Sequence, residues 1–250
     1  MAQPRISVFA DLEALSRQAV AHFTELAENR TRARDIFTVA LSGGSTPRRL
    51  YELLATPPWS EGLPWSSIQF FQVDERCVPP DHVESNYRMI REALLDRAGI
   101  PEENFHRIEA ERSDREEAAL EYAKQIARFL RPRPGAWPRF DLVLLGMGAD
   151  GHTASLFPGS PALDEKHLWV ASNYVKQLAA CRVTLTLPVL NAAAEILFLV
   201  AGAEKAERLR EVIADSDGPR RLPAQRVAPS DGTVIWYLDE AAAGWLQSPG

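Results

Sequence analysis

The sequence predicts an α/β fold in which helices pack against a mostly parallel β-sheet. Short apolar runs rich in strand-forming residues alternate with segments of helical periodicity over most of the 250 residues, and this alternation is typical of βαβ units. Runs such as 140–145 do not alternate between polar and apolar residues, as expected for strands buried on both faces. Hydrophobic residues make up 46% of the chain and charged residues 25%, so there is enough material for a core.

The first half of the chain predicts four helices and two strands. Apolar residues follow a helical spacing behind Asp11, a residue type favoured at helix N-caps. Thr46-Pro47 opens the second helix, because proline suits the first helical position. Ser113 and Glu116 form a capping-box pattern before the fourth. The strands are expected over 36–41 and 68–73, and the helices over 12–23, 46–55, 85–95 and 113–130.

The second half predicts more strands than helices. Residues 131–138 are expected to form a loop because of their proline density, and a strand over 140–145 follows. Further strands are expected over 168–170, 182–187, 196–200 and 234–238, and helices over 203–214 and 239–246. In parallel sheets, ligands bind beyond the carboxyl ends of the strands. The residues that directly follow the strand runs are therefore the first candidates for chemistry.

The charge balance and the cysteine count exclude several classes of function. The 28 Lys and Arg residues against 34 Asp and Glu residues give a net charge of −6, so broad binding to nucleic acid or to an anionic membrane is not expected. Cys77 and Cys181 form neither a disulfide framework nor metal-ligand pairs. The longest segment without charged residues has 13 residues, too few for a membrane helix. Because no signal peptide is visible, the cytosol is the expected compartment.

The first strand end, Ser42-Gly-Gly-Ser-Thr46, has the parts of a phosphate cradle. Gly43 and Gly44 permit close backbone approach, and the helix that follows offers free N–H groups and the positive end of its dipole. Ser45 and Thr46 add hydroxyl donors. The alternative is a plain glycine turn in which Ser45 or Thr46 only caps the helix.

The second strand end carries three consecutive charged residues, Asp74, Glu75 and Arg76. Asp74 and Glu75 are suited to binding sugar hydroxyls or handling protons, and Arg76 to pairing with a phosphate through its planar guanidinium. The alternative is a solvated loop with a local ion pair.

The third strand end contains Gly146, Gly148 and Gly151, which formally match a dinucleotide fingerprint. Prolines follow within ten residues, so the long helix that this fingerprint requires has no room, and the dinucleotide interpretation is disfavoured. The remaining signal is Asp150-Gly-His152. Histidine suits proton transfer near neutral pH, and a neighbouring carboxylate can orient its ring.

These strand ends, in this order and spacing, resemble the 6-phosphogluconolactonase family. The resemblance runs from about residue 8 to residue 245, and its most specific segment is Gly146-Met-Gly-Ala-Asp-Gly-His-Thr-Ala-Ser-Leu-Phe-Pro158. The other matching segments are Ser42-Gly-Gly-Ser-Thr-Pro47, Asp74-Glu-Arg76, Ser85-Asn-Tyr87, Arg182-Val-Thr-Leu-Thr-Leu-Pro188 and Leu222-Pro-Ala-Gln225.

The resemblance implies hydrolysis of 6-phospho-D-glucono-1,5-lactone to 6-phospho-D-gluconate in the oxidative pentose phosphate pathway. It also implies one domain over residues 1–250, built as a three-layer α/β/α sandwich around a mostly parallel, modified Rossmann-like sheet. A small sugar-phosphate lactone is then the expected partner, with no metal and no organic cofactor, and a monomer is the default oligomeric state.

Site residues carry over from the family one by one. His152 resembles the general base, and Asp150 the neighbouring acid that orients the site. The substrate-binding residues that the resemblance and the strand ends suggest are Gly43, Gly44, Ser45, Thr46, Asp74, Arg76, Asn86, Lys176 and Arg182. The prolines that family members usually place before the Arg of the later strand are absent around Lys176, so Arg182 matches better than Lys176.

Two other functions compete with a lactonase. Glucosamine-6-phosphate deaminase/isomerases share the fold, but their Asp-Gly-His loop continues into Ala-Phe-Asn-Glu-Pro, whereas this chain continues Thr153-Ala-Ser-Leu-Phe-Pro158. A sugar-phosphate sensor without catalysis commonly carries a helix-turn-helix module, for which this chain has no basic N-terminal segment.

Overall fold

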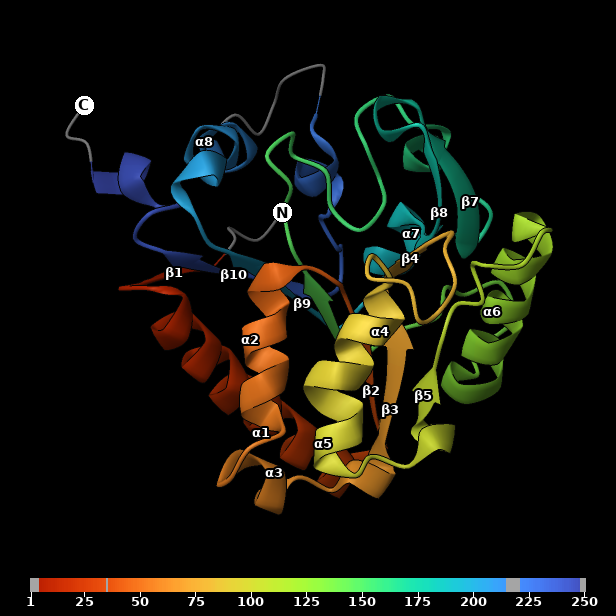
Figure 1. The fold of residues 1–250 in the computed structure, drawn as a ribbon, viewed down its shortest axis with the longest axis horizontal. Coiled ribbons are helices and arrows are strands. Elements are labelled where there is room, and N and C mark those ends of the chain that lie inside the picture. The colour runs from red at the N-terminus through yellow and green to blue at the C-terminus, as the bar shows by residue number, and fades with distance from the viewer. Residues whose placement is uncertain (1–4, 35, 215–220, 248–250) are drawn as a thin grey trace.

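The computed structural model describes residues 5–34, 36–214 and 221–247. Its larger sheet has seven strands in the order β1-β10-β9-β6-β2-β3-β5, and every neighbouring pair is parallel (Figure 1). The expected mostly parallel sheet is therefore confirmed. The strands are β1 (Arg5–Phe9), β2 (Phe37–Leu41), β3 (Ile68–Gln72), β5 (Phe105–His106), β6 (Leu142–Leu145), β9 (Glu195–Val200) and β10 (Thr233–Asp239).

Alternate residues of the buried strands feed two separate hydrophobic clusters, one on each face of the sheet. In β6, Leu142 and Leu144 pack with α1 (Leu12–Arg34), α2 (Ser45–Leu54) and α4 (Asn86–Ile90). The intervening Val143 and Leu145 pack with helices on the opposite face. These are α6 (Arg115–Leu130), α7 (Leu187–Leu190) and α8 (Ala206–Ala214). The predicted three-layer α/β/α sandwich is confirmed.

A second sheet of three antiparallel strands lies beside α6. Its order is β4-β8-β7, with β4 (Asp74–Arg76), β8 (Ala180–Leu185) and β7 (Val170–Val175). Figure 1 shows this sheet at the upper right, beyond the carboxyl end of β3. Only Val73 separates β3 from β4, so the chain passes directly from the large sheet to the small one. The three charged residues expected just beyond a strand end, with a solvated loop as the alternative, therefore lie on a strand of their own.

Several predicted elements are confirmed, and six need correction. The helix expected over 12–23 runs to Arg34, and the strand expected over 182–187 spans Ala180–Leu185, with Leu187 already in α7. Asp114, not Ser113, caps α6, because its carboxylate accepts the N–H groups of Glu116 and Glu117. The helix expected over 85–95 is α4 followed by a π-helical turn, Arg91–Leu95, and by α5 (Asp96–Ala98).

The other two corrections concern the second half of the chain. The strand expected over 168–170 begins at Val170 and continues to Val175. The helix expected over 239–246 is a turn after β10, followed by the 3-10 turn Gly244–Gln247. The sequence patterns did not predict β1, β4 or β5 as strands. Among the residues described, no helix is long and apolar enough to cross a membrane.

Candidate active site

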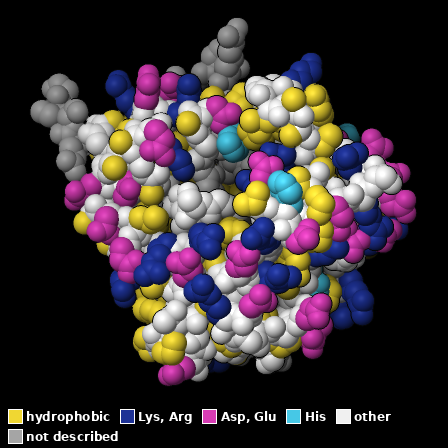
Figure 2. All heavy atoms as spheres, in the orientation of Figure 1, with side chains coloured by type: hydrophobic (Ala, Val, Ile, Leu, Met, Phe, Trp, Pro, Cys, Tyr) yellow, Lys and Arg dark blue, Asp and Glu magenta, His cyan; other side chains and the backbone are white. Residues whose placement is uncertain are grey.

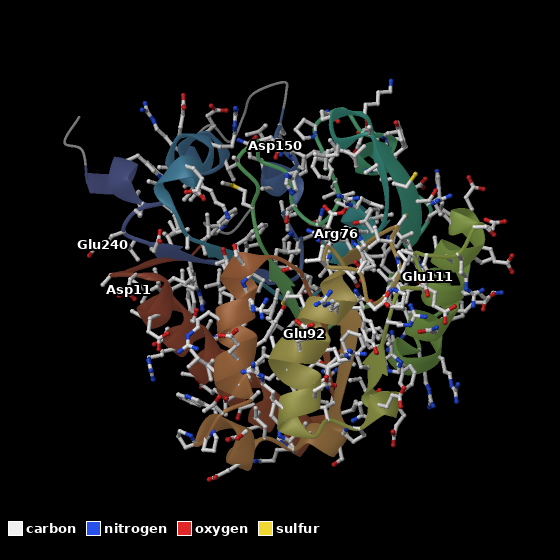
Figure 3. All side chains as sticks on the ribbon, in the orientation of Figure 1. Asp11, Arg76, Glu92, Glu111, Asp150 and Glu240 are labelled. Carbon is white, nitrogen blue, oxygen red and sulfur yellow. The ribbon has the colours of Figure 1, made fainter. Side chains whose placement is uncertain are left out.

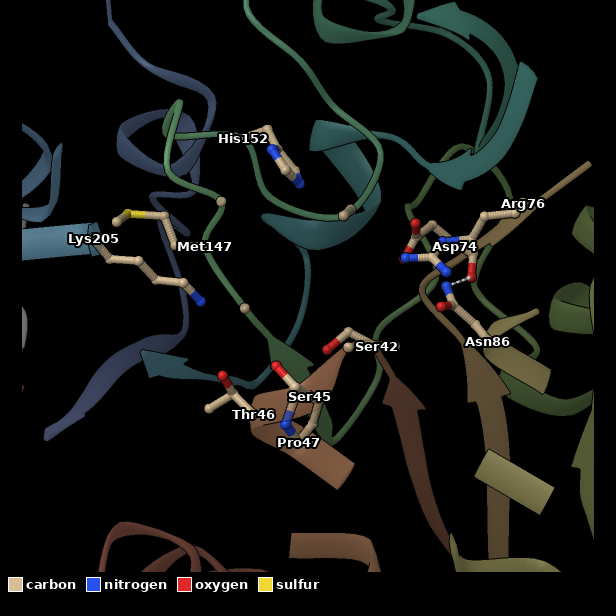
Figure 4. Close-up of a pocket in the computed structure, with 15 residues that line it drawn as sticks. Ser42, Ser45, Thr46, Pro47, Asp74, Arg76, Asn86, Met147, His152 and Lys205 are labelled. Atoms are coloured by element: carbon tan, nitrogen blue, oxygen red, sulfur yellow. Dashed lines mark hydrogen bonds between the residues drawn. The ribbon is translucent and has the colours of Figure 1, made fainter. Parts of the chain in front are cut away.

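A pocket of about 220 Å³ opens at the carboxyl ends of the central strands of the large sheet. It is lined by residues 42–47, 146–148, Asp74, Arg76, Asn86, His152, Ala154 and Lys205. The three strand ends singled out in the sequence thus meet at one place, as Figure 4 shows. In Figure 3, Asp150 and Arg76 lie at this end of the molecule.

One wall of the pocket is the start of α2. Gly44 is the N-cap residue, with φ of 108°, and no side chain caps the helix, so the interpretation in which Ser45 or Thr46 serves only as a cap is wrong. The Ser42 hydroxyl is buried and has no hydrogen-bond partner among the described residues. Free N–H groups at a helix start and the positive end of the dipole favour an anion.

Gly43 is required by its neighbour across the pocket. A Cβ atom at this position would lie 1.7 Å from Asn86 Oδ1. Any other residue would therefore displace the Asn86 side chain or the turn itself.

Lys205 joins the same wall, and sequence reasoning missed it. It ends a 3-10 turn, Ala203–Lys205, that follows β9 and Gly202, whose φ is 106°. Burial lowers the pKa of the Lys205 ammonium, while the charges of Glu204 and Asp239 oppose that shift. Lys205 could have been predicted from its place shortly after the strand run 196–200. The other site residues were found because they follow predicted strands in the same way.

The opposite wall comes from β4 and α4. Asp74 is buried, and its Oδ2 accepts a hydrogen bond of 2.6 Å from Ser155 Oγ. Asn86 Nδ2 donates to the Asp74 carbonyl oxygen at 2.9 Å, and the Arg76 guanidinium donates to the Glu84 carbonyl. Figure 4 places these side chains across the pocket from Lys205 and Thr46.

Glu75 is buried outside the pocket and connects the elements of this wall by hydrogen bonds. Its carboxylate is buried and accepts hydrogen bonds from Gln72 Nε2, the Ser85 hydroxyl, and the backbone N–H groups of Arg76, Asn86 and Tyr87, at 2.7–3.1 Å. Burial raises the pKa of Glu75, and the backbone donors oppose that shift. The residue therefore fixes the start of α4 against β4 and does not line the pocket.

His152 lies on the glycine-rich loop after β6. Its Nδ1 lies 2.5 Å from Asp150 Oδ1, and its ring stacks on Phe157 with centroids 4.1 Å apart. Burial raises the pKa of Asp150, but the hydrogen bond and the charge of His152 outweigh it, so the pKa of this carboxyl lies below its usual value. A Cβ at Gly148 would lie 2.1 Å from His152 Cε1, and thus the ring occupies space that only glycine leaves.

Most of the predicted site residues meet in the pocket, but not all of them. Asp150 does not line it and contacts His152 from outside. Lys176 is exposed in the 3-10 turn Lys176–Leu178, and Arg182 is half-buried in β8 opposite Arg76; neither lines the pocket. No group of three or more His, Cys, Asp or Glu side chains is placed to hold a metal within the described ranges.

Charged side chains of both signs lie on the surface around the pocket. Figure 2 shows Lys and Arg side chains gathered over α2 and α4, interspersed with acidic ones. Pairs such as Arg48–Glu52 and Arg88–Glu92 make up part of this surface. The charged surface near the pocket therefore consists in part of paired charges, and Lys205 lies in the pocket itself.

Comparison with known proteins places the chain in a protein family. The family model described as glucosamine-6-phosphate isomerases/6-phosphogluconolactonase matches residues 10–236. The chain belongs to this family. A 6-phosphogluconolactonase of Synechocystis sp. is 41% identical over 240 residues, which cover 96% of this chain and 97% of that protein. The resemblance inferred from the motifs is confirmed.

Solved structures of the family agree with the fold. A 6-phosphogluconolactonase from Trypanosoma cruzi superposes with a TM-score of 0.87 at 34% identity, covering 98% of both chains. A monomeric glucosamine-6-phosphate deaminase superposes with a TM-score of 0.79 at 19% identity, covering 96% of this chain and 99% of its own. At that identity the likeness to the deaminase concerns the fold alone.

Proposed function

We propose that this chain hydrolyses 6-phospho-D-glucono-1,5-lactone to 6-phospho-D-gluconate. The observation that carries the proposal is the His152–Asp150 pair at the rim of a pocket whose opposite side is the open start of α2. Near-full-length similarity to 6-phosphogluconolactonases supports it.

The phosphate group fits the wall made by α2 and Lys205. The helix start supplies backbone N–H donors, Ser45 and Thr46 supply hydroxyls, and Lys205 supplies a positive charge. Because the phosphate is remote from the reacting carbon, its binding energy serves to orient the lactone ring. Arg76, on the opposite wall, is then proposed to contact the sugar end of the substrate together with Asp74 and Asn86. In this arrangement Lys176 and Arg182 do not contact the substrate.

The proposed base is Nε2 of His152. The ionised Asp150 carboxylate accepts the Nδ1 proton, which fixes the tautomer and leaves Nε2 basic. Nε2 takes a proton from water as the water oxygen attacks the lactone carbonyl carbon. When the tetrahedral intermediate collapses, the ring C–O bond breaks and the imidazolium returns the proton to the departing ring oxygen. Water is thereby added across the ester bond, and the base is regenerated.

The developing oxyanion needs a donor that is not already engaged. The Ser42 hydroxyl is buried, lines the pocket and lacks a partner in the described part of the chain, so we assign it to a substrate oxygen. Donors placed in advance at such a position stabilise the transition state because they need no reorganisation.

A direct assay tests the proposed function. The chain is mixed with freshly generated 6-phosphogluconolactone, and acid release is followed above the spontaneous rate at fixed pH, with glucosamine 6-phosphate as the control substrate. We expect rapid hydrolysis of the lactone and no release of ammonia from the amino sugar. Ammonia release without lactone hydrolysis would establish the deaminase instead, and binding without turnover would indicate a sensor.

We further propose that the enzyme acts as a cytosolic monomer without a metal or an organic cofactor. A six-membered lactone is already reactive, so a positioned base suffices. Turnover should persist after dialysis against EDTA, and gel filtration at assay concentration should give the mass of one chain, 27.8 kDa. Loss of activity that added divalent metal restores would contradict the first expectation.

A further inference from the structure

Two cysteines that the proposed reaction does not use face each other across the small sheet. Strands β4 and β8 are antiparallel, with Arg76 opposite Arg182, and the next residues in register are Cys77 and Cys181. The Cys77 N–H donates to the Cys181 carbonyl oxygen at 3.3 Å, so the pairing continues one residue beyond β4. Directly opposed residues of antiparallel strands point to the same side of the sheet, and both of these are half-buried, free thiols.

The spacing of such a pair suits a disulfide. Hydrogen-bonded residues of antiparallel strands have Cα atoms about 5.5 Å apart, which lies within the range that disulfides span. The Arg115 guanidinium lies beside the Cys77 thiol, and Arg182 lies near it. Burial raises the pKa of the Cys77 thiol, and the two guanidinium groups oppose that shift, so the case for a disulfide depends on the strand geometry.

We propose that Cys77 and Cys181 form a reversible disulfide by exchange with a small-molecule disulfide such as oxidised glutathione. The Cys181 thiolate attacks one glutathione sulfur, which releases the first glutathione thiol and leaves a mixed disulfide. The Cys77 thiolate then attacks Cys181 Sγ, and the second glutathione leaves. The chain loses two electrons and two thiol protons, and oxidised glutathione gains them as two molecules of the reduced form.

This bond would act on the pocket wall that contains Arg76. Opposed Cβ atoms of a strand pair lie about 4.5–5.5 Å apart, whereas a disulfide draws them to about 3.8 Å. The strand ends must approach each other next to Arg76 and Arg182. We therefore expect oxidation to raise KM for the phosphorylated lactone, a consequence that rests on the proposed function.

The first test measures the bond itself. The native chain is equilibrated in glutathione buffers of increasing oxidised fraction, trapped with an alkylating reagent and analysed by intact and non-reducing peptide mass. We expect both thiols to disappear together, with a peptide joining Cys77 to Cys181, and Cys77→Ser to give only a mixed disulfide with glutathione. Two thiols that stay alkylatable, or a doubly glutathionylated chain, would overturn the proposal.

The second test measures the coupling to the site. The oxidised chain should show a several-fold higher KM with kcat nearly unchanged, and dithiothreitol should restore the reduced value. Cys77→Ser and Cys181→Ser should keep the reduced KM in both buffers. A disulfide that forms and leaves KM unchanged would overturn the coupling. A reduced chain without lactonase activity would count against the proposed function, and the mass measurement would still decide the disulfide.

Discussion

The two sheets line the same pocket with different kinds of group. The large sheet contributes strand ends whose polar groups are open: the uncapped start of α2, the Ser42 hydroxyl and Lys205. The small sheet contributes groups already engaged within the protein, since Asp74 accepts from Ser155 and its carbonyl accepts from Asn86. Open groups are available to a ligand, and engaged groups hold positions, so the two walls should respond differently to substitution.

Strand β2 and the small sheet also differ in the side chains that they bury. All five residues of β2 are buried, and four of them are apolar. The small sheet instead buries Asn173 and Thr184. Asn173 Nδ2 donates to the Ser155 carbonyl at 2.8 Å, and Thr184 Oγ1 accepts from the Ser155 N–H at 3.2 Å. The small sheet thus anchors the loop that carries His152.

The largest effect is expected at the residue between the two walls. His152→Ala should lower kcat by about 10²–10⁴-fold, which is the usual contribution of a positioned general base. The unfolding transition should stay within a few degrees of wild type, because the side chain lies at the surface of the pocket. The exposed His167, changed to Ala, is the matched control and should leave kcat unchanged. Near wild-type turnover of the His152 variant would remove this residue from the mechanism.

Comparing the cations of the two walls sharpens the contrast. Lys205→Ala should lower kcat/KM for the phosphorylated lactone by about 10- to 100-fold, since a charge-assisted hydrogen bond is worth roughly 1.5–3 kcal/mol, and should change little with unphosphorylated gluconolactone. Arg76→Ala, on the opposite wall, should affect both substrates by similar factors. If Arg76→Ala were the more selective against the phosphorylated substrate, the phosphate would bind at the β4 wall instead.

A smaller effect is expected from weakening the hydrogen bonds that hold the pocket wall formed by β4 and α4. Glu75→Gln keeps the shape but turns one accepting oxygen into a donor that faces other donors, at a cost of roughly 1–3 kcal/mol in folding stability. KM should rise several-fold with a smaller change in kcat, because Arg76 and Asn86 lose their fixed positions. Glu92→Gln, at the half-buried partner of Arg88 on the π-helical turn after α4, is the control. A fall in kcat at constant KM would argue for a chemical role of Glu75.

The smallest effect on activity is expected in the large sheet away from the pocket, where a histidine affects stability instead. His106 on β5 is buried beside Phe71 and Phe129, and burial, followed by the charge of Arg128, lowers its pKa from 6.5 to about 4. The unfolded chain therefore binds more protons between these values. The free energy of unfolding should fall by roughly 1 kcal/mol per pH unit as the pH drops from 6.5 to 4, and this contribution should stay constant above 6.5.

His106→Gln tests that dependence. Chemical denaturation at several pH values should show a shallower slope for this variant in the same window, whereas His167→Gln should keep the wild-type slope. Activity at neutral pH should change little. An unchanged slope would assign the acid sensitivity to other groups.

Sequence reasoning located elements whose signal is local. The strand runs 36–41, 68–73 and 140–145 are mostly apolar, and burial in a parallel sheet favours that pattern. Strand β4 carries Asp74, Glu75 and Arg76, so it has no apolar signal. Its extended shape depends on pairing with β8, more than a hundred residues later, which no local window contains.

The same distinction applies to the site: residues with a local sequence signal were predicted, and the others were not. The glycines and His152 can be predicted from their residue type and spacing. All residues of the predicted turn from Gly43 to Thr46 line the pocket. Lys205 was not predicted as a site residue, because a lysine in a segment expected to be helical resembles many surface lysines. The five hydrogen bonds of Glu75 were also invisible, since their donors come from three segments that only the folded chain brings together.

The pairing of β1 with β10 has a consequence for how the chain is made. Arg5 lies opposite Ile235 and Phe9 opposite Asp239, so β1 has no partner in the sheet until residues 233–239 have been translated. The central strand β6 likewise waits for β9 on one side. Contacts so distant along the chain fold slowly. The nascent chain should therefore expose β1 until then, and a stop codon before residue 233 would both remove β10 and leave β1 without its partner.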